Sequence, residues 1–380
     1  MKSGRAVIKR SRLKNAGLLK IESCMNKIVN VIPEEIDSLI LIVDQFLKSH
    51  KNEYKVNQLM DKLYTILDSI IILDSKKKVT KKVKDDDKNY IMIKKKIGEG
   101  NYAVINRCVI NNKSFVVKIA KFNKNNKDEV TIDFLKENLI HIILFCFHDL
   151  MNKCFKISSV DRCIPEIVDL VKSSDEKNKN DKLIVVMEEL DSDGEKFFSK
   201  KKPYKDELKF IALVAYNIYF LQKSVKQFIH RDMHAKNIMI KKTEKSKTKI
   251  VVMEGRNKFS FDVESDYRTY LIDFGMSCFD LASCLKLLNM PVSKISSPGS
   301  YRTNYCDNRS HDMRLFLCSI YENGYPLSDN LNNWLDELFE GYYLKEGFWG
   351  MYEQVLKIKD PNFYPENILK KISQELNDLS

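Results

Sequence analysis

The sequence predicts an α+β protein of two lobes, a small strand-rich lobe followed by a larger helical lobe. Residues 90–96 alternate between apolar and polar side chains, as a half-buried strand does, and residues 183–187 form a continuous apolar strand. From residue 207 to residue 225, apolar residues recur at helical spacing instead. A chain of 380 residues is long enough for such a domain and an additional element.

Composition indicates a globular protein that works inside the cell. The hydrophobic fraction of 44% is ordinary. No apolar run approaches the roughly 18 residues needed to span a bilayer, and the basic N-terminus lacks the apolar region of a secretory signal. The nine cysteines are scattered and form no C-x-x-C pair, which favours reduced thiols over disulfides or a zinc site. We therefore expect a cytoplasmic or nuclear protein without a membrane segment.

The N-terminal quarter is expected to lie outside the two lobes. Residues 1–20 form a basic, flexible arm, residues 21–75 carry two apolar helical stripes typical of an αα-hairpin, and residues 76–89 form a charged linker. The net charge of +12 favours acidic or polyanionic partners. A solvated tail and linker is the simpler interpretation, and a nucleic-acid, membrane-surface or targeting role stays open. The hairpin either packs on the main domain or binds a partner.

A phosphate-binding loop is expected after the first strand. Residues 98–105 fit G-x-G-x-x-G with alanine in place of the third glycine, and glycine lets backbone amides approach phosphates closely. The next strand, 114–119, carries Lys118, which is placed to contact the α and β phosphates of a nucleotide; a solvated surface lysine is the alternative. The nucleotide-binding residues expected in this lobe are Gly98, Glu99, Gly100, Asn101, Tyr102, Ala103, Ile105 and Lys118.

A helix is expected over residues 128–147, and one of its acids should pair with Lys118. Glu129, Asp133 and Glu137 share one face at i, i+4 spacing. Glu137 is favoured because it lies near the middle of the helix, within comfortable reach of the strand, but the other two stay open.

Two histidines and a polar stretch follow. His141 and His148 lie on an apolar helix, where packed and hydrogen-bonded imidazoles are favoured over metal ligands. Residues 173–182 are polar and are expected to form a loop.

The strand 183–187 leads into a segment expected to bind adenine. It ends at Met187, which would lie behind the ring, and continues into Glu188, Glu189 and Leu190. Backbone groups from Glu188 to Leu190 would contact adenine, and backbone contacts depend little on side-chain type.

Two motifs supply the expected chemistry. His230-Arg231-Asp232 with Asn237 fits H-R-D-x-x-x-x-N, and a later run beginning at Asp273 fits D-F-G; both are typical of protein kinases. Phosphoryl transfer depends mostly on positioning and charge neutralisation. Asp232 is the candidate base, and Asn237 and Asp273 are the candidate Mg²⁺ ligands. This resemblance implies ATP and Mg²⁺ as cofactors and a serine or threonine of a protein as the acceptor, with Asp232, Lys118 and Glu137 as the catalytic set.

Further features resemble the haspin family of atypical protein kinases. His234 stands where most serine/threonine kinases have lysine, the insertion 241–270 precedes Asp273, and no Ala-Pro-Glu follows. The resemblance covers roughly residues 90–358 and implies a rebuilt activation segment, although haspins usually depart from D-F-G. Asp312 would be the buried helical aspartate that supports the catalytic loop. Some kinases of large DNA viruses are also haspin-like, and the Lys-, Asn- and Ile-rich composition suits such a source; a viral kinase could also reside in the particle.

The later part of the chain completes the helical lobe. Within the insertion we expect a charged turn, a strand at 249–253, a second turn and a strand at 259–263. Aromatic residues such as Trp334 and Phe339 are expected in the core, and a last helix begins near Pro361. The expected organisation after residue 89 is an N-lobe with hinge at 90–190 and a C-lobe at 191–380.

Two other functions are compatible with these motifs. One is a pseudokinase scaffold that binds nucleotide without turnover, although every essential residue is in place. The other is a small-molecule kinase, a class that usually has His-Gly-Asp where this chain has Arg231.

Overall fold

The computed structural model describes most of the chain after residue 91. The described ranges are 92–100, 103–110, 113–121, 163–175, 180–225, 228–254, 257–277, 308–340 and 359–379, with the helical positions 134, 137, 138, 140, 141, 144 and 145 between them. The basic arm, the helical hairpin and the linker expected over residues 1–89 lie outside the described residues.

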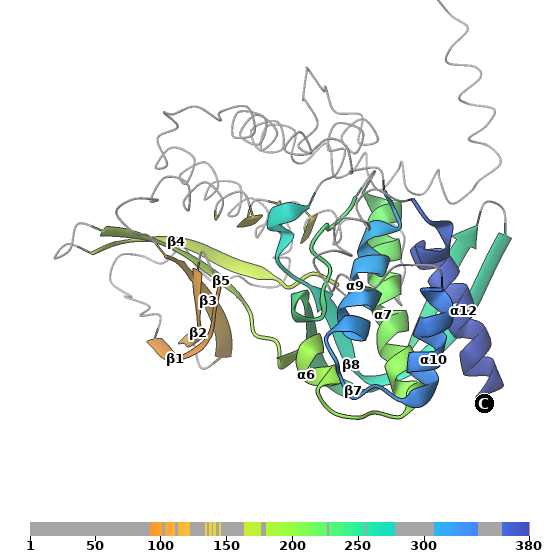
Figure 1. The fold of residues 1–380 in the computed structure, drawn as a ribbon. Coiled ribbons are helices and arrows are strands. Elements are labelled where there is room, and N and C mark those ends of the chain that lie inside the picture. Colours follow the sequence, from red (N-terminus) through yellow and green to blue (C-terminus); the bar gives the residue numbers. More distant parts are fainter. Residues whose placement is uncertain are drawn as a thin grey trace, which may run out of the picture.

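The N-lobe is built on a five-stranded antiparallel sheet, on the left in Figure 1, with the strand order β1-β2-β3-β5-β4. The β-branched residues on β3 and β5 form its buried centre, where Val117 and Val186 pair directly. The expected helix after β3 is present at the described positions, and its Phe134 and Leu144 are buried in the main core. The strands are β1 (Met92–Glu99), β2 (Ala103–Ile110), β3 (Lys113–Ala120), β4 (Ile167–Asp175) and β5 (Asn180–Glu188).

The polar loop expected over residues 173–182 was wrong. Most of this stretch belongs to the β4–β5 hairpin, in which Ser173 pairs with Lys182 and Asp175 pairs with Asn180. Backbone hydrogen bonds hold the end of a hairpin together whatever its side chains are, so polarity alone did not exclude strand.

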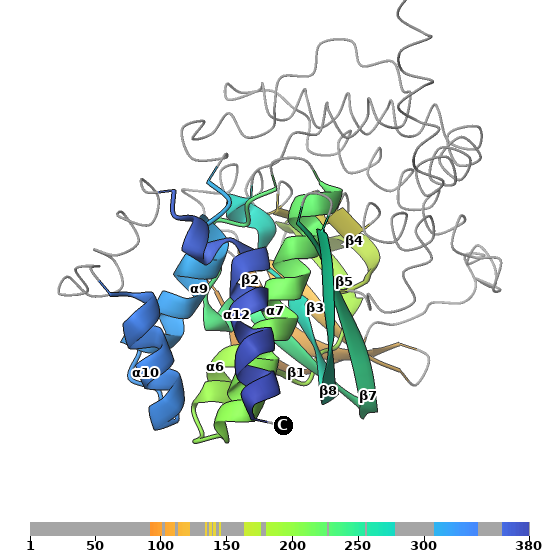
Figure 2. The same cartoon turned by 90° about the vertical axis from the view of Figure 1, so that its right-hand side faces the viewer.

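The C-lobe is helical and centres on α7 (Tyr204–Ser224), which lies beside α9 (His311–Glu322) and α12 (Pro365–Asp378) in Figures 1 and 2. Every residue of α7 from Phe210 to Leu221 is buried, as expected for a helix that is apolar on all sides. The expected helices at 207–225 and near the C-terminus are therefore present. The other helical elements are α6 (Gly194–Phe198), α10 (Asp329–Leu338) and the 3₁₀ turns η1 (Ala235–Asn237), η2 (Phe274–Met276) and η4 (Pro361–Phe363).

The expected insertion forms one long hairpin. β7 (Ile238–Glu254) pairs antiparallel with β8 (Asn257–Leu271), and the short β6 (Ser192–Asp193) joins the other edge of β7. The strands are longer than the sequence indicated, and the expected charged turn is only an irregularity in register between Lys242 and Ser246. The charged side chains of that stretch hid the apolar–polar alternation of a strand. Exposed charged side chains are tolerated on the solvent-facing side of a hairpin.

Buried aromatic residues and cysteines agree with the sequence-based expectations. Trp334 and Phe339 are buried in the core. Cys108, Cys163 and Cys318 are buried free thiols. Within the described residues, none of the helices combines the length and apolar content that a membrane span requires.

Candidate active site

Lys118 on β3 forms an ion pair with Glu137 on the following helix. Lys118 Nζ donates to Glu137 Oε1, and the two side chains are each only 16% exposed. Burial raises the pKa of Glu137; the Lys118 ammonium opposes that rise, and the nearby charge of Asp273 adds to it. The pairing favoured from sequence is therefore present, and the competing acids Glu129 and Asp133 lie outside the described residues. The pair fixes the direction of Lys118.

The glycine-rich segment forms the connection between β1 and β2. Gly98 pairs across the strands with Ile105, and the Gly100 N–H donates to the carbonyl of Ala103 at 2.9 Å. A side chain at Gly100 would meet no described atom within 4 Å, so there is free space beside this residue. Asn101 and Tyr102 lie outside the described residues.

The carboxylate of Glu99 is held by lysines. Its bonds to Lys121 and Lys96 lower the pKa of Glu99 to about 2. Lys121, the residue after β3, also donates to the carbonyl of Gly100 at 2.9 Å, so one lysine holds the two adjacent residues at the start of the glycine turn.

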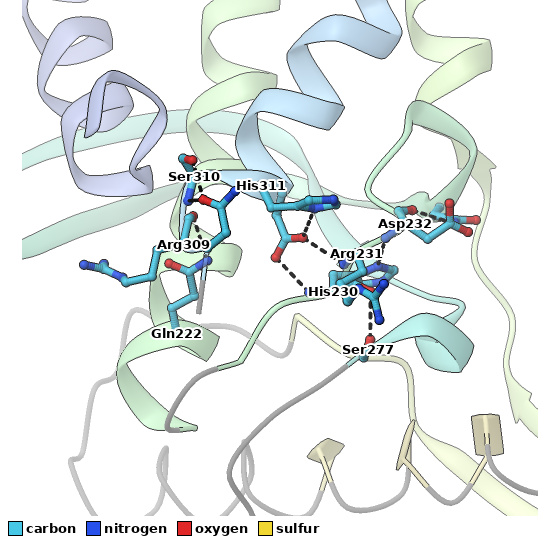
Figure 3. Close-up of polar contacts among 11 residues, drawn as sticks. Gln222, His230, Arg231, Asp232, Ser277, Arg309, Ser310 and His311 are labelled. Carbon is cyan, nitrogen blue, oxygen red and sulfur yellow. Dashed lines mark hydrogen bonds and ion pairs between the residues drawn. The ribbon is translucent and has the colours of Figure 1, made fainter. Parts of the chain in front are cut away.

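The candidate catalytic loop, which contains His230, Arg231 and Asp232, is held by Asp312 on α9. The backbone N–H groups of His230 and Arg231 donate to the two oxygens of this carboxylate at 2.8 and 2.9 Å (Figure 3). Asp312 is fully buried; burial alone would raise its pKa, but hydrogen bonding from His311 and from the loop holds that pKa below its ordinary value. The predicted role of Asp312 is confirmed. These hydrogen bonds support the left-handed backbone of Arg231, whose φ is 70°.

Asp232 and Asn237 face each other across the loop. Asn237 Nδ2 donates to the backbone carbonyl of Asp232 at 2.8 Å and to Asp232 Oδ2 at 3.0 Å. Asn237 is buried, whereas the Asp232 side chain is 33% exposed. Because the amide hydrogens of Asn237 point to Asp232, its oxygen is presented on the other side.

Asp273 returns to this loop from β8. The Ile272 N–H donates to the carbonyl of Asn237 at 3.1 Å, which places the start of the D-F-G run beside the catalytic loop. Asp273 has a φ of 64°, a conformation that non-glycine residues adopt mainly where the surroundings require it. Its carboxylate is exposed, while the next residue, Phe274, is fully buried.

Phe274 lies between two histidines from different lobes. Its ring centroid is 5.3 Å from that of His141 and 5.1 Å from that of His230. His141 Nε2 lies 2.8 Å from the carbonyl of Pro165 and, since that atom can only accept, donates to it. Burial lowers the pKa of His141 to about 4, so the imidazole is neutral near pH 7. His141 is a packed, hydrogen-bonded histidine as expected, but the sequence did not reveal that Phe274 contacts two histidine rings, one edge-on and one tilted.

His230, the other histidine beside Phe274, also holds the segment that contains the D-F-G run. His230 Nε2 donates to the carbonyl of Ile272 at 2.9 Å. Ser277 Oγ donates to the carbonyl of His230 at 3.2 Å (Figure 3). The segment around Phe274 is thus bonded to the catalytic loop at both ends.

His234 lies beside Asp232, the candidate base. Its Nε2 is 3.7 Å from Asp232 Oδ1. Burial lowers the pKa of His234, although the charges of Asp232 and Asp273 oppose that shift. Asp273 in turn lies near Glu137, because a Cβ added at Gly275 would be 3.6 Å from Asp273 Oδ1 and 3.7 Å from Glu137 Cγ.

The expected adenine-binding segment lies where β5 leaves the N-lobe. Met187 pairs with Val116 in the sheet and packs against the core. Glu188 and Leu190 follow with half-buried side chains.

The oxygen donors at this site suit Mg²⁺, which substrate phosphates also bind, better than a metal ion held by protein side chains alone. No group of three or more His, Cys, Asp or Glu side chains suitable for a metal ion occurs in the described part of the chain. The amide oxygen of Asn237 and the exposed carboxylate of Asp273 are two oxygen donors on adjoining segments. Mg²⁺ is commonly held by one or two such groups together with substrate phosphates, so the residues present fit this ion.

Comparison with known proteins agrees with this architecture. Residues 91–254 match the family model for protein tyrosine and serine/threonine kinases. A search of curated proteins gave no match. A crystal structure described as a kinase domain is 17% identical, with 74% of this chain and 94% of that chain covered and a TM-score of 0.37, a likeness on which no argument rests. With its five-stranded N-lobe, helical C-lobe and family match, the chain has the two-lobed α+β fold of the protein kinases.

Proposed function

We propose that this protein is an ATP- and Mg²⁺-dependent kinase that transfers the γ-phosphate to a serine or threonine of a protein substrate. The observation that carries the proposal is the convergence of Lys118, Asp232 and Asp273 from three separate segments. Lys118 is bonded to Glu137, and a Cβ added at Gly275 would lie within 4 Å of both Glu137 and Asp273. The Ile272 N–H, just before Asp273, donates to Asn237, whose side chain donates to Asp232. Kinase chemistry needs this set of charges around one phosphate group.

Asp232 is the proposed base. Its carboxylate is accessible and oriented by Asn237, so it can align a substrate hydroxyl and accept its proton as the phosphoryl group is transferred. Lys118, directed by Glu137, would bind the α and β phosphates. His234, close to Asp232 and disfavoured as a cation by burial, is suited to a hydrogen bond with substrate or phosphate.

Nucleotide would lie between the glycine-rich turn and the hinge. A side chain at Gly100 would meet no described atom within 4 Å, which leaves room for phosphate beside the glycine-rich turn. Adenine would meet backbone groups of the segment from Glu188 to Leu190. Asn237 and Asp273 would hold Mg²⁺, which supplies charge neutralisation at the phosphates when bound.

The haspin-like assignment is part of this proposal. It is supported by His234, by the long β7–β8 hairpin before Asp273 and by a sequence without Ala-Pro-Glu after that aspartate. The proposed organisation places the N-lobe and hinge at 90–190 and the C-lobe at 191–380. The Lys-, Asn- and Ile-rich composition supports a viral source, and we propose a cytoplasmic or nuclear location, or the virion for a viral kinase.

The test is phosphate incorporation from radiolabelled ATP on a peptide array, followed by phosphoamino-acid analysis. We expect phosphoserine or phosphothreonine with the wild type and a loss of at least about 100-fold with Asp232→Asn, since a positioned base contributes typically 10²–10⁴-fold. Asp266→Asn, an exposed acid on β8, is the matched control and should keep full activity. Equal incorporation by the wild type and Asp232→Asn would refute the proposal, and nucleotide binding without turnover would favour a pseudokinase scaffold.

A further inference from the structure

We propose that Lys241 on β7 is a positioning residue for nucleotide binding, because it fastens the hinge at Glu188 to the strand that leaves the catalytic loop. The inference rests on the proposed function, in which the backbone of residues 188–190 contacts adenine. It concerns a contact that neither kinase motif contains.

Glu188 joins three segments through one carboxylate. Lys241 Nζ donates to Glu188 Oε1. The Glu166 N–H, ahead of β4, donates to Glu188 Oε2 at 3.4 Å, and the Glu188 N–H donates back to the carbonyl of Glu166 at 2.9 Å. The first hinge residue is thus held by the N-lobe through Glu166 and by the C-lobe through Lys241.

Glu189 and Asp191, which follow Glu188, are also bonded to neighbouring strands. Asp191 Oδ2 accepts from the Lys242 N–H at 2.7 Å, and the Asp191 N–H donates to the carbonyl of Ile240 at 2.8 Å. On the other side, Arg107 on β2 donates from Nε to Glu189 Oε1 at 2.5 Å. Three acidic side chains therefore tie this short segment to β2 and β7.

The ion pair of Lys241 with Glu188 connects the hinge to the catalytic loop through β7. β7 begins at Ile238, directly after Asn237, and reaches Lys241 three residues later. The catalytic loop has its own anchor in Asp312, so loss of the Lys241 contact should loosen the hinge while leaving Asp232 in place. A binding segment held in its bound shape lowers the conformational cost of binding, and loosening it weakens affinity.

The surroundings of the ion pair set the size of the effect. The Lys241 side chain is 38% exposed and that of Glu188 is 19% exposed, so water screens the pair only in part. Exposed pairs are worth up to about 1 kcal/mol, which corresponds to about fivefold in a binding constant. We expect Lys241→Met to weaken nucleotide binding by about fivefold.

The experiment measures the Kd of a fluorescent ATP analogue and, separately, kcat and the KM for ATP. Lys242→Met is the matched control, because Lys242 is the exposed neighbour whose backbone, not its side chain, contacts the hinge. Lys241→Met should raise Kd and KM about fivefold with kcat unchanged at saturating ATP, whereas Lys242→Met should leave all three unchanged. Lys241→Arg should restore binding, and adding Glu188→Gln to Lys241→Met should weaken it little further.

The outcomes separate this inference from the proposed function. A wild type that binds nucleotide but transfers no phosphate refutes the proposed function alone, because the Kd comparison still reports on Lys241. Equal Kd values for the wild type and Lys241→Met, or the same loss with Lys242→Met, overturn the role of Lys241. A wild type that binds no nucleotide overturns both.

Discussion

Replacement of Asp312 by asparagine should both destabilise the protein and impair the catalytic loop. The fully buried carboxylate accepts the N–H groups of His230 and Arg231, one on each oxygen. An asparagine can accept only one of them and turns its own NH₂ toward the other. Hydrogen bonds to charged groups contribute about 1.5–3 kcal/mol each, so the loss of one bond and the buried donor left unpaired should cost about 3–5 kcal/mol.

Chemical denaturation with a fluorescence readout measures this cost, and steady-state kinetics measures the second effect. We expect kcat to fall at least about tenfold where the variant is still folded, because the left-handed backbone of Arg231 directly precedes Asp232 and loses its support. Asp378→Asn, an exposed acid at the end of α12, is the control and should change neither quantity. A loss below about 1 kcal/mol together with normal kcat would refute the claim that Asp312 supports the loop.

The dependence of stability on pH gives a further test of the contact between Asp312 and the loop. Because the folded-state pKa of Asp312 is lowered, its contribution to stability is present above the pKa of the unfolded chain and is lost as pH falls through the folded-state pKa. The stability difference between the wild type and Asp312→Asn should therefore shrink in the acid range below pH 4. A difference that stays constant down to the lowest pH at which the protein folds would contradict this origin of the effect.

Three further predictions follow from the described contacts. Glu137→Gln, which leaves Lys118 without its ionic partner, should lower kcat/KM for ATP at least about tenfold in a steady-state assay; an unchanged value would mean that another acid directs the lysine. Phe274→Ala removes the ring that contacts both histidines and should lower the free energy of unfolding by about 3–5 kcal/mol in a denaturation experiment. A loss under about 1 kcal/mol would show that these ring contacts contribute little packing energy. Glu207→Ala, which deprives the N–H and hydroxyl of Ser328 of their buried acceptor at the start of α10, should cost about 1–3 kcal/mol by thermal denaturation, and an unchanged Tm would exclude this capping role.

Local patterns were enough to identify the elements of chemistry. The H-R-D-x-x-x-x-N and D-F-G runs indicated Asp232, Asn237 and Asp273 because phosphoryl transfer needs a positioned base and oxygen ligands for Mg²⁺, and each run is a short local pattern. The pairing of Lys118 with Glu137 was also favoured from sequence, because both lie on regular elements whose geometry limits reach. The structure pairs Lys118 with Glu137 and places the D-F-G run beside the loop of Asp232 and Asn237.

Patterns failed where backbone pairing or distant contacts decided the outcome. The polar residues at 173–182 did not indicate a hairpin, since strand pairing is made by backbone groups that every side chain shares. Two contacts join residues far apart in the chain: Glu188 with Lys241, and His141 edge-on with Phe274. No rule of sequence spacing predicts either contact.

The order of motifs along the chain, and hence the kind of chemistry expected, was determined by the sequence alone, because each motif is a local arrangement of residue types. Only the tertiary structure decided which acid meets Lys118, what holds the catalytic loop and what ties the hinge to β7. Those contacts depend on how separate elements pack, and packing energy is shared among residues that the sequence does not place side by side.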